Sequence, residues 1–210
     1  MSAQQVLLQG IAQLGLVIDE DKRQKLLAYV QMISKWNKVH NLTAIRDEVS
    51  MMTLHILDSL VTLPLIQQDE HILDVGSGAG LPGIVIAICK PDVQVTVIDA
   101  SQKKASFMRQ VKAELDLQNL TVLAGRVEQQ MIATPFDSII SRAFSDLKTF
   151  ISLTQGLLKK QGRWLAMKGQ VPQEEIDALT AAMGVTIDAI IPLQVPGLDA
   201  ERHILIIKHI

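Results

Sequence analysis

The sequence of 210 residues has one cysteine, Cys89, so no disulfide bond can form within the chain. A protein without disulfides suits a reducing compartment, and we expect this one to be cytoplasmic. The first residues lack the basic start and the continuous apolar core of a signal peptide. No apolar run approaches the length of about 18 residues that a membrane helix needs. These absences predict a soluble intracellular protein.

Aromatic residues are scarce too, at 3% of a chain that is 48% hydrophobic. Aliphatic side chains and eight methionines must therefore fill most of the core. The five histidines form neither an HExxH motif nor a cluster with cysteines, so we expect no metal site. A formal net charge of −2 excludes a surface covered with basic residues. It still allows a local basic patch that binds nucleic acid.

The hydrophobic periodicity divides the chain into residues 1–66 and residues 67–210. The first part predicts a helical extension, because apolar residues recur at three- and four-residue steps. Its first helix should end near Gly15, and Asp19 is a plausible N-cap for the second. A third helix is expected over residues 47–63, followed by Pro64. Residues 67–210 are expected to form the main domain.

In this second part, short runs rich in Val and Ile alternate with helical stretches, which indicates a mostly parallel sheet with helices on both faces. The expected strands are 71–75, 94–99, 120–124, 136–141, 163–168, 185–191 and 203–209. The expected helices are 81–90, 101–117, 145–160 and 172–183. Only a loop with Pro196 and Gly197 separates the last two strands. An antiparallel final strand should therefore complete a seven-stranded α/β sheet.

A glycine-rich segment follows the first predicted strand. Two spacings compete there: Gly76-x-Gly78-x-Gly80 is typical of S-adenosylmethionine (AdoMet) methyltransferases, and Gly78-x-Gly80-x-x-Gly83 of dinucleotide-binding enzymes. The glycine motif should begin directly after the strand, which ends at Val75. This position favours the frame that starts at Gly76. An NAD-linked oxidoreductase that uses the second frame remains an alternative.

Acidic residues flank this segment. Asp74 precedes Gly76 by two residues, where a carboxylate could offset the ammonium group of AdoMet. Asp99 closes the second strand and could accept the ribose hydroxyls, or it could cap the next helix instead. Val127 and Glu128 follow the third strand and could border an adenine, although a plain loop is equally consistent with them.

The sequence resembles the bacterial small-subunit ribosomal RNA methyltransferase G family, also called glucose-inhibited division protein B. The resemblance spans nearly the whole chain. Its motifs are Lys35-Trp36-Asn37, Asn41-Leu42-Thr43, His55-Ile56-Leu57-Asp58-Ser59, Leu73 to Gly83, Arg126-Val127-Glu128, Ser141-Arg142-Ala143-Phe144 and Lys168-Gly169. The glycine loop alone is generic, whereas Leu-Pro-Gly with the Trp-Asn and Ser-Arg-Ala motifs is specific.

This resemblance implies a class I, Rossmann-like AdoMet methyltransferase fold. It also implies methylation at N7 of one guanine in the 530 loop of 16S ribosomal RNA. The cofactor contacts that it implies are Gly76, Leu81, Val127, Glu128 and Arg142. The resemblance does not say whether naked 16S rRNA or a 30S particle is the substrate. It also leaves the oligomeric state open, and a monomer is our expectation.

Guanine N7 has a free lone pair, so the reaction needs correct positioning more than a general base. No catalytic residue is therefore certain. Arg142 and Lys168 end neighbouring strands and could meet the AdoMet carboxylate or an RNA phosphate, although structural salt bridges are an alternative. Asn41 and Thr43 could close over the cofactor, or they could form a simple turn between helices.

A candidate RNA-binding patch lies on the helix after Asp99. It comprises Lys103, Lys104, Arg109 and Lys112, with Lys148, Lys159 and Lys160 further along the chain. A solvated helix face is the alternative interpretation of these charges. Trp36 and Phe144 could stack on a base, but core positions are more usual. A small-molecule methyltransferase and a non-enzymatic division or RNA-binding module also remain possible functions.

Overall fold

The computed structural model describes residues 1–179 and 183–210. Within these residues, seven strands form one sheet in the order β3-β2-β1-β4-β5-β7-β6. The strands are β1 (His71–Val75), β2 (Gln94–Asp99), β3 (Leu120–Ala124), β4 (Phe136–Arg142), β5 (Leu158–Lys168), β6 (Val185–Pro192) and β7 (His203–His209). The predicted seven-stranded α/β sheet is confirmed.

The strands pair in parallel from β3 to β5. Strand β7 pairs antiparallel with both β5 and β6. The prediction of an antiparallel final strand is therefore confirmed, because the short connection from β6 to β7 can only reverse the chain direction.

The strand order also locates a crevice. The chain runs from β1 outward to β2 and β3, then crosses to β4 on the other side of β1. Ligands of open α/β sheets bind at the carboxyl ends of the strands, where the order reverses in this way. That point is the carboxyl end of β1, where the glycine segment begins.

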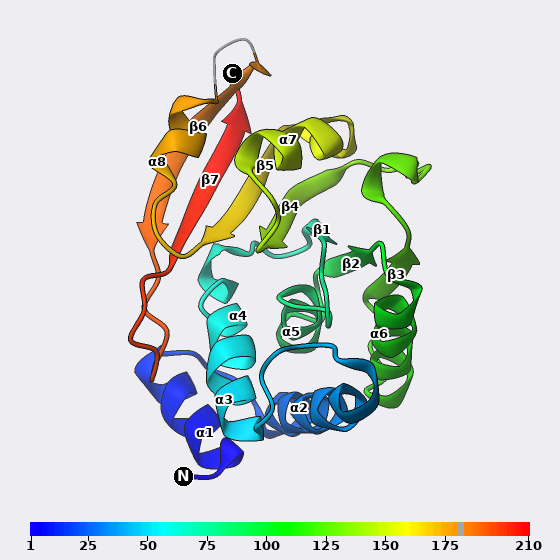
Figure 1. Ribbon diagram of the computed structural model, residues 1–210, viewed down its shortest axis with the longest axis vertical. Coiled ribbons are helices and arrows are strands. Elements are labelled where there is room, and N and C mark those ends of the chain that lie inside the picture. The colour runs from blue at the N-terminus through cyan, green and yellow to red at the C-terminus, as the bar shows by residue number, and fades with distance from the viewer. Residues whose placement is uncertain (180–182) are drawn as a thin grey trace.

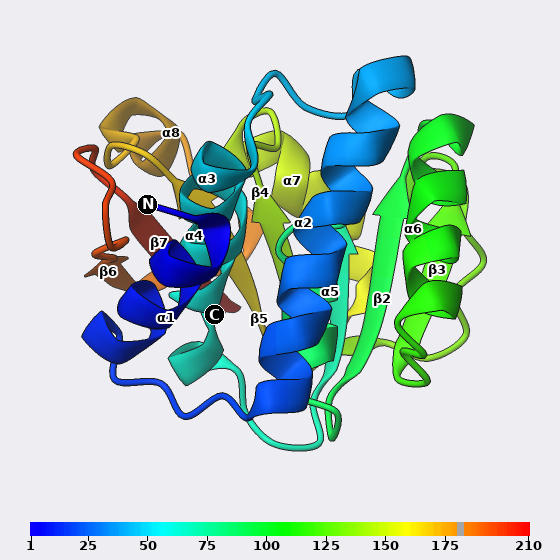
Figure 2. The same cartoon turned by 90° about the horizontal axis from the view of Figure 1, so that it is seen from below.

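Helices cover both faces of the sheet, with α1 to α6 on one face and α7 and α8 on the other (Figure 1). The α-helices are α1 (Ala3–Gln13), α2 (Glu20–His40), α3 (Glu48–Met51), α4 (Asp58–Leu60), α5 (Gly83–Cys89), α6 (Gln102–Glu114), α7 (Leu147–Thr154) and α8 (Gln173–Asp177). Seen from below, α2 lies across the middle of the first layer, between α1 and α6 (Figure 2).

The N-terminal helices have the expected caps and pack on the sheet layer. The Asp19 carboxylate accepts a hydrogen bond from the Lys22 N–H at 2.9 Å, which confirms this residue as the N-cap of α2. The Trp36 ring lies 5.4 Å from that of Phe107 in α6. Its indole N–H donates to Gln110 at 3.0 Å. Trp36 thus joins α2 to α6 as a half-buried residue that packs against the core.

The third predicted helix is not a uniform α-helix. Residues Met52–Leu57 form a π-helical turn between α3 and α4, and Leu63–Leu65 form a 3-10 turn. A π turn inserts one extra residue into the helix, so the side chains after it shift around the axis. Periodicity alone does not reveal such an insertion, because the apolar stripe stays nearly continuous.

Two predicted helices are shorter in the structure. Strand β5 begins at Leu158 instead of 163, so residues 158–160 extend the sheet, where Leu158 pairs with Phe136. Helix α8 ends at Asp177 and has no fully buried side chain, so little packing energy extends it. Residues 180–182 of the predicted helix 172–183 lie outside the described residues.

Among residues 1–179 and 183–210, no helix is both long and apolar enough to cross a membrane. The same residues contain no group of three or more His, Cys, Asp or Glu side chains arranged to hold a metal ion.

Candidate functional site

The glycine segment turns sharply at the carboxyl end of β1. Gly76, Gly78 and Gly80 have φ angles of 70°, 62° and 96°, a region that side chains with a Cβ atom rarely adopt. The Gly76 N–H donates to the Ile98 carbonyl at 2.9 Å, and the Gly78 N–H donates to the Asp99 carboxylate at 2.9 Å. These bonds attach the turn to the end of β2.

Gly76 also leaves space beside the turn. A Cβ atom at this position would lie 3.3 Å from Cδ2 of Phe144 and would narrow the gap between the two segments. A residue without a side chain here lets a ligand approach the backbone closely. This cradle fits the nucleoside cofactor that the sequence predicts.

A cavity of about 220 Å³ opens next to Gly76, and we call it the glycine-turn cavity. It is lined by Val75, Gly76, Ile98, Asp99, Ala100, Gly125, Arg126, Val127, Glu128, Phe144 and Leu153. Four residues predicted to bind the cofactor, Gly76, Asp99, Val127 and Glu128, therefore lie around one space. Its apolar walls suit the faces of a purine ring.

Asp99 does not cap the next helix, because the N-cap of α6 is Ser101, whose side chain accepts from the Lys104 N–H. One carboxylate oxygen accepts from the Gly78 N–H, and the other accepts from the Ser101 N–H at 2.9 Å. Lys104 Nζ lies 3.6 Å from the same carboxylate. Each carboxylate oxygen can accept more than one hydrogen bond, so these contacts orient Asp99 and leave it able to bind ribose hydroxyls.

Asp74 lies beneath the turn and does not line the glycine-turn cavity. Its Oδ2 accepts from the Gly83 N–H at 2.8 Å, while its buried Oδ1 has no hydrogen-bond partner in the described residues. Burial raises the pKa of this carboxyl group to about 7. Leu81 is likewise buried in the core. Their contacts with a cofactor, and that of Gly78, stay predictions.

A second cavity of about 490 Å³ lies on the other side of the same segment, and we call it the arginine cavity. It is lined by Ile45, Leu54, His55, Asp58, Arg142, Ala143, Met167, Lys168, Gly169 and Arg202. The two cavities are neighbours, because Ala143 lines the arginine cavity and the next residue, Phe144, lines the glycine-turn cavity. A cofactor at Gly76 would therefore lie next to a substrate in the arginine cavity.

Arg142 leads into this cavity from the end of β4. Its Nη1 donates to the Leu54 carbonyl at 3.0 Å and to the Asp58 carboxylate at 3.0 Å. The other oxygen of Asp58 accepts from Arg202 Nε at 2.8 Å. Two guanidinium groups thus share one buried carboxylate at the cavity wall.

His55 connects Arg142 to the segment between α2 and α3. Its Nε2 lies 2.9 Å from Thr43 Oγ1, and its Nδ1 lies 3.5 Å from Arg142 Nη2. Burial, reinforced by the nearby Arg142 charge, lowers the pKa of His55 to about 4. The ring is therefore neutral at pH 7. Its Nδ1 lies closer to the Leu54 carbonyl, at 3.1 Å, and donates its proton there.

Lys168 and Asn41, the other catalytic candidates, are placed differently. Lys168 lines the arginine cavity, and its Nζ lies 2.8 Å from the Glu175 carboxylate. Asn41 caps α2 with a φ angle of 49° and accepts from Arg46 at 3.2 Å. It lines neither cavity, whereas Thr43 approaches the site through His55.

The predicted RNA patch does not form one uniform face. Lys103 and Arg109 of α6 are exposed, and Lys112 is half-buried. Lys104 turns toward Asp99 instead. Lys148 and Lys160 are exposed elsewhere, and Lys159 forms an ion pair with Asp137 at 2.7 Å.

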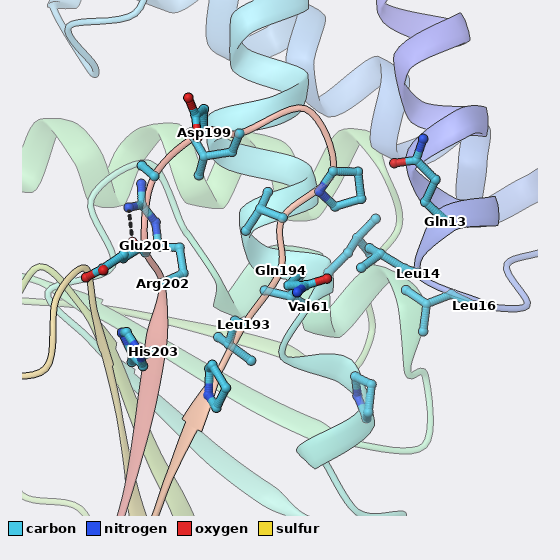
Figure 3. A pocket seen from close by; sticks show the side chains of 17 residues that line it. Gln13, Leu14, Leu16, Val61, Leu193, Gln194, Asp199, Glu201, Arg202 and His203 are labelled. Carbon is cyan, nitrogen blue, oxygen red and sulfur yellow. Dashed lines mark hydrogen bonds between the residues drawn. The ribbon is translucent and has the colours of Figure 1, made fainter.

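A larger cavity, of about 980 Å³, lies apart from the glycine turn (Figure 3). It separates the turn after α1 from the connection between β6 and β7, and its rim carries the acidic Asp199 and Glu201. Arg202 stands at its edge, where it donates to the Glu201 carbonyl at 2.9 Å (Figure 3). Arg202 therefore borders both this space and the arginine cavity.

The sequence did not single out His55, Asp58 or Arg202 as site residues. The first two belong to a motif of the family resemblance, and a carboxylate within an apolar helical stripe signals a buried charge that needs a partner. Arg202 has no comparable signal, because only the tertiary fold brings it to Asp58.

The strand order, the glycine turn at the switch point and the acidic end of β2 define the class I methyltransferase fold. A solved TehB-like SAM-dependent methyltransferase from Corynebacterium glutamicum has this fold. The two superpose with a TM-score of 0.57 at 15% identity, covering 87% of this chain and 98% of that one.

Residues 22–205 match the family described as rRNA small subunit methyltransferase G. The protein of that name from Methylobacillus flagellatus is 58% identical over 202 residues, or 96% of each chain. Its namesake from Neisseria meningitidis serogroup C is 51% identical over 199 residues, or 95% of each chain. The chain belongs to this family. The predictions of the family and of an AdoMet-dependent methyltransferase are thereby confirmed.

Proposed function

We propose that this protein transfers a methyl group from AdoMet to N7 of a guanine in the 530 loop of 16S ribosomal RNA. One observation carries the proposal: the segment Arg142–Phe144 separates a purine-sized cavity at the glycine turn from a cavity lined by arginines. The first space suits a nucleoside cofactor, and the second suits an anionic nucleotide. Family membership supports the ribosomal RNA target.

The residues of the glycine-turn cavity would hold the cofactor. Gly76 would give access to the backbone, Asp99 would accept from the ribose, and Val127 would pack on the adenine beside Glu128. Arg142 would pair with the carboxylate of the cofactor. When bound, AdoMet supplies a methyl group that its sulfonium activates for transfer.

The protein contributes position and charge more than proton transfer. Guanine N7 has a free lone pair and no proton to lose, so no side chain has to act as a base. His55, whose lowered pKa keeps it neutral, stays in its hydrogen bonds with Thr43 and the Leu54 carbonyl. The apolar Leu54 and Met167 line the arginine cavity, and they would help to exclude water once a substrate fills it.

The RNA substrate must reach this cavity as an accessible nucleotide, because a stacked base does not expose N7 to a buried methyl donor. We propose that Lys103, Arg109 and Lys112 contact RNA phosphates near the site, while Lys104 stays at Asp99. We also propose that the protein acts as a cytoplasmic monomer. In it, residues 1–66 form a helical extension of the methyltransferase domain, residues 67–210.

The direct test is methyl transfer from labelled AdoMet to 16S rRNA and to 30S particles taken from cells that lack the protein. We expect label at a single N7-methylguanosine in the 530 loop. Gly76→Arg should abolish the transfer, because its side chain would fill the glycine turn. Gly156→Arg is the matched control, since a Cβ at Gly156 meets no atom within 4 Å.

Other outcomes would favour the alternatives. Transfer to metabolites but not to RNA would indicate a small-molecule methyltransferase. Calorimetric binding of NAD without binding of AdoMet would indicate an oxidoreductase. Normal cellular function of Gly76→Arg would indicate a role that needs no methyl transfer.

A further inference from the structure

The π turn before α4 provides the groups that hold Arg142. The Asp58 N–H bonds to carbonyls that include that of Thr53, five residues back, and not to that of Leu54, its partner in an α-helix. The Leu54 carbonyl accepts from Arg142 Nη1 instead, at 3.0 Å. The same turn brings His55 Nδ1 to within 3.5 Å of Arg142 Nη2. π turns of this kind occur frequently at functional sites.

The single carboxylate of Asp58 contacts two arginine side chains. Its side chain is 3% exposed, and its two oxygens contact Arg142 Nη1 at 3.0 Å and Arg202 Nε at 2.8 Å. One negative charge therefore faces two positive charges, which come from the end of β4 and from the residue before β7 at the same edge of the sheet. The excess positive charge lies at the arginine cavity, which both arginines line. An anionic ligand would balance it.

One arginine is enough to neutralise the charge of a buried carboxylate. The pair of Glu70 and Arg163, at the opposite end of the strands, has that simpler form, with a distance of 2.9 Å. Ala143 adds a second sign of function, because it follows Arg142 with a φ angle of 59°. Backbone strain at a residue other than glycine persists where the surrounding structure enforces it, often at binding sites.

We propose that Asp58 is a positioning residue that holds the guanidinium groups of Arg142 and Arg202 at the arginine cavity, where they bind an anionic group. This inference rests on the proposed function, which supplies two such groups: the carboxylate of AdoMet and the phosphate of RNA. Asp58 touches neither ligand. It acts through the direction that it gives to the two arginines.

The test is a set of kinetic and binding measurements on Asp58→Asn in the full chain. The asparagine keeps the size of the side chain but carries no charge. Its amide group can accept from one arginine only, because its NH2 donates and must face the other. We expect kcat/KM to fall about a hundredfold, as misplaced binding groups cause. Calorimetry with AdoMet and filter binding with 16S rRNA show which anion loses its contact. Asp58→Glu should recover part of the activity.

A positioning role makes a specific prediction for combined variants. In the background Arg142→Gln with Arg202→Gln, the further change Asp58→Asn should alter both affinities less than about twofold, because its partners are already gone. If Asp58→Asn changed the affinities by the same factor in the wild type and in the double arginine variant, the inference would be overturned. If Asp58→Asn fails to fold, the same comparison is made with Asp58→Glu.

Glu70→Gln is the matched control, because it also removes a buried carboxylate charge from an arginine. It should lower thermal stability and leave kcat/KM unchanged. A wild-type protein that does not methylate 16S rRNA would contradict the proposed function. An active wild type with fully additive variants would contradict only the role of Asp58.

Discussion

The hydroxyl of Tyr29, in the middle of α2, donates a hydrogen bond to the carbonyl of Ala79 in the glycine turn at 2.6 Å. Tyr29 is completely buried, and the two residues are 50 positions apart in the sequence. The N-terminal helices therefore support the cofactor loop directly.

Tyr29→Phe should reduce stability by about 1–2 kcal/mol, because it leaves the buried Ala79 carbonyl without its donor. It should also weaken AdoMet binding several-fold, since the loop loses a support. Urea unfolding and calorimetry measure the two effects. Thr62→Val, which removes another buried hydroxyl bond, to Ser59, should lower stability alone. Equal effects of both variants on affinity would contradict a specific role of Tyr29.

Gly83→Ala should destabilise the protein by about 1–3 kcal/mol, as overpacking of a core does. The new Cβ would lie 2.5 Å from Cγ1 of Val97 and 2.8 Å from Oδ2 of Asp74. Thermal unfolding measures the loss. Gly156→Ala has open space around it and should shift stability by less than about 0.5 kcal/mol.

Asp74 should make stability depend on pH. Its folded pKa of about 7 exceeds the ordinary value of 3.8 because of burial. The folded state therefore binds the proton more tightly, and the contribution of Asp74 to stability declines as pH rises from about 4 to about 7. In urea unfolding across this range, Asp74→Asn should gain stability relative to wild type as pH rises. A constant difference would show that Asp74 titrates normally.

His55 should act in the opposite direction. Burial lowers its folded pKa from 6.5 to about 4, so its contribution is present above pH 6.5 and is lost as pH falls toward 4. His55→Gln should therefore become less destabilising, relative to wild type, as the pH falls through this window. The same unfolding series measures it, with His40→Gln, at the half-buried C-terminal end of α2, as the control. Parallel curves for wild type and His55→Gln would contradict the shift.

Lys168→Gln should raise KM for RNA about tenfold, if its charge at the arginine cavity meets a phosphate. Its partner Glu175 also accepts from the Leu147 N–H at 2.8 Å. Glu175→Gln should therefore reduce stability while it leaves Lys168 free to bind RNA. Steady-state kinetics separate the two variants. Equal changes in KM would assign Lys168 a structural role only.

The exposed cations of α6 should determine how salt affects RNA binding. Lys103→Gln and Arg109→Gln should each reduce the slope of log affinity against log salt by about one, the effect of losing one phosphate contact. Filter binding at several salt concentrations measures the slope. Lys208→Gln removes an exposed cation, paired with Asp188, at the other end of β7. An equal change in this control would show that the effect is not local.

Most of the fold and part of the site could be predicted from the sequence. The strand positions, the cap at Asp19 and the antiparallel β7 follow from local patterns of apolar residues, turns and chain length. The proximity of Gly76 and Asp99 was also predictable, because both sit at strand ends that a parallel sheet must bring to the same edge.

The sequence by itself determined the order of strands and helices, the family and the glycine turn, since each depends on neighbouring residues or on a motif. The tertiary structure alone decided the π turn, the length of β5 and the contact of Asp58 with Arg142 and Arg202. Asp58 is 84 positions from Arg142 and 144 positions from Arg202 along the chain. Only the packing of α4 against the ends of β4 and β7 brings their charges together, because no local pattern encodes a contact over such separations.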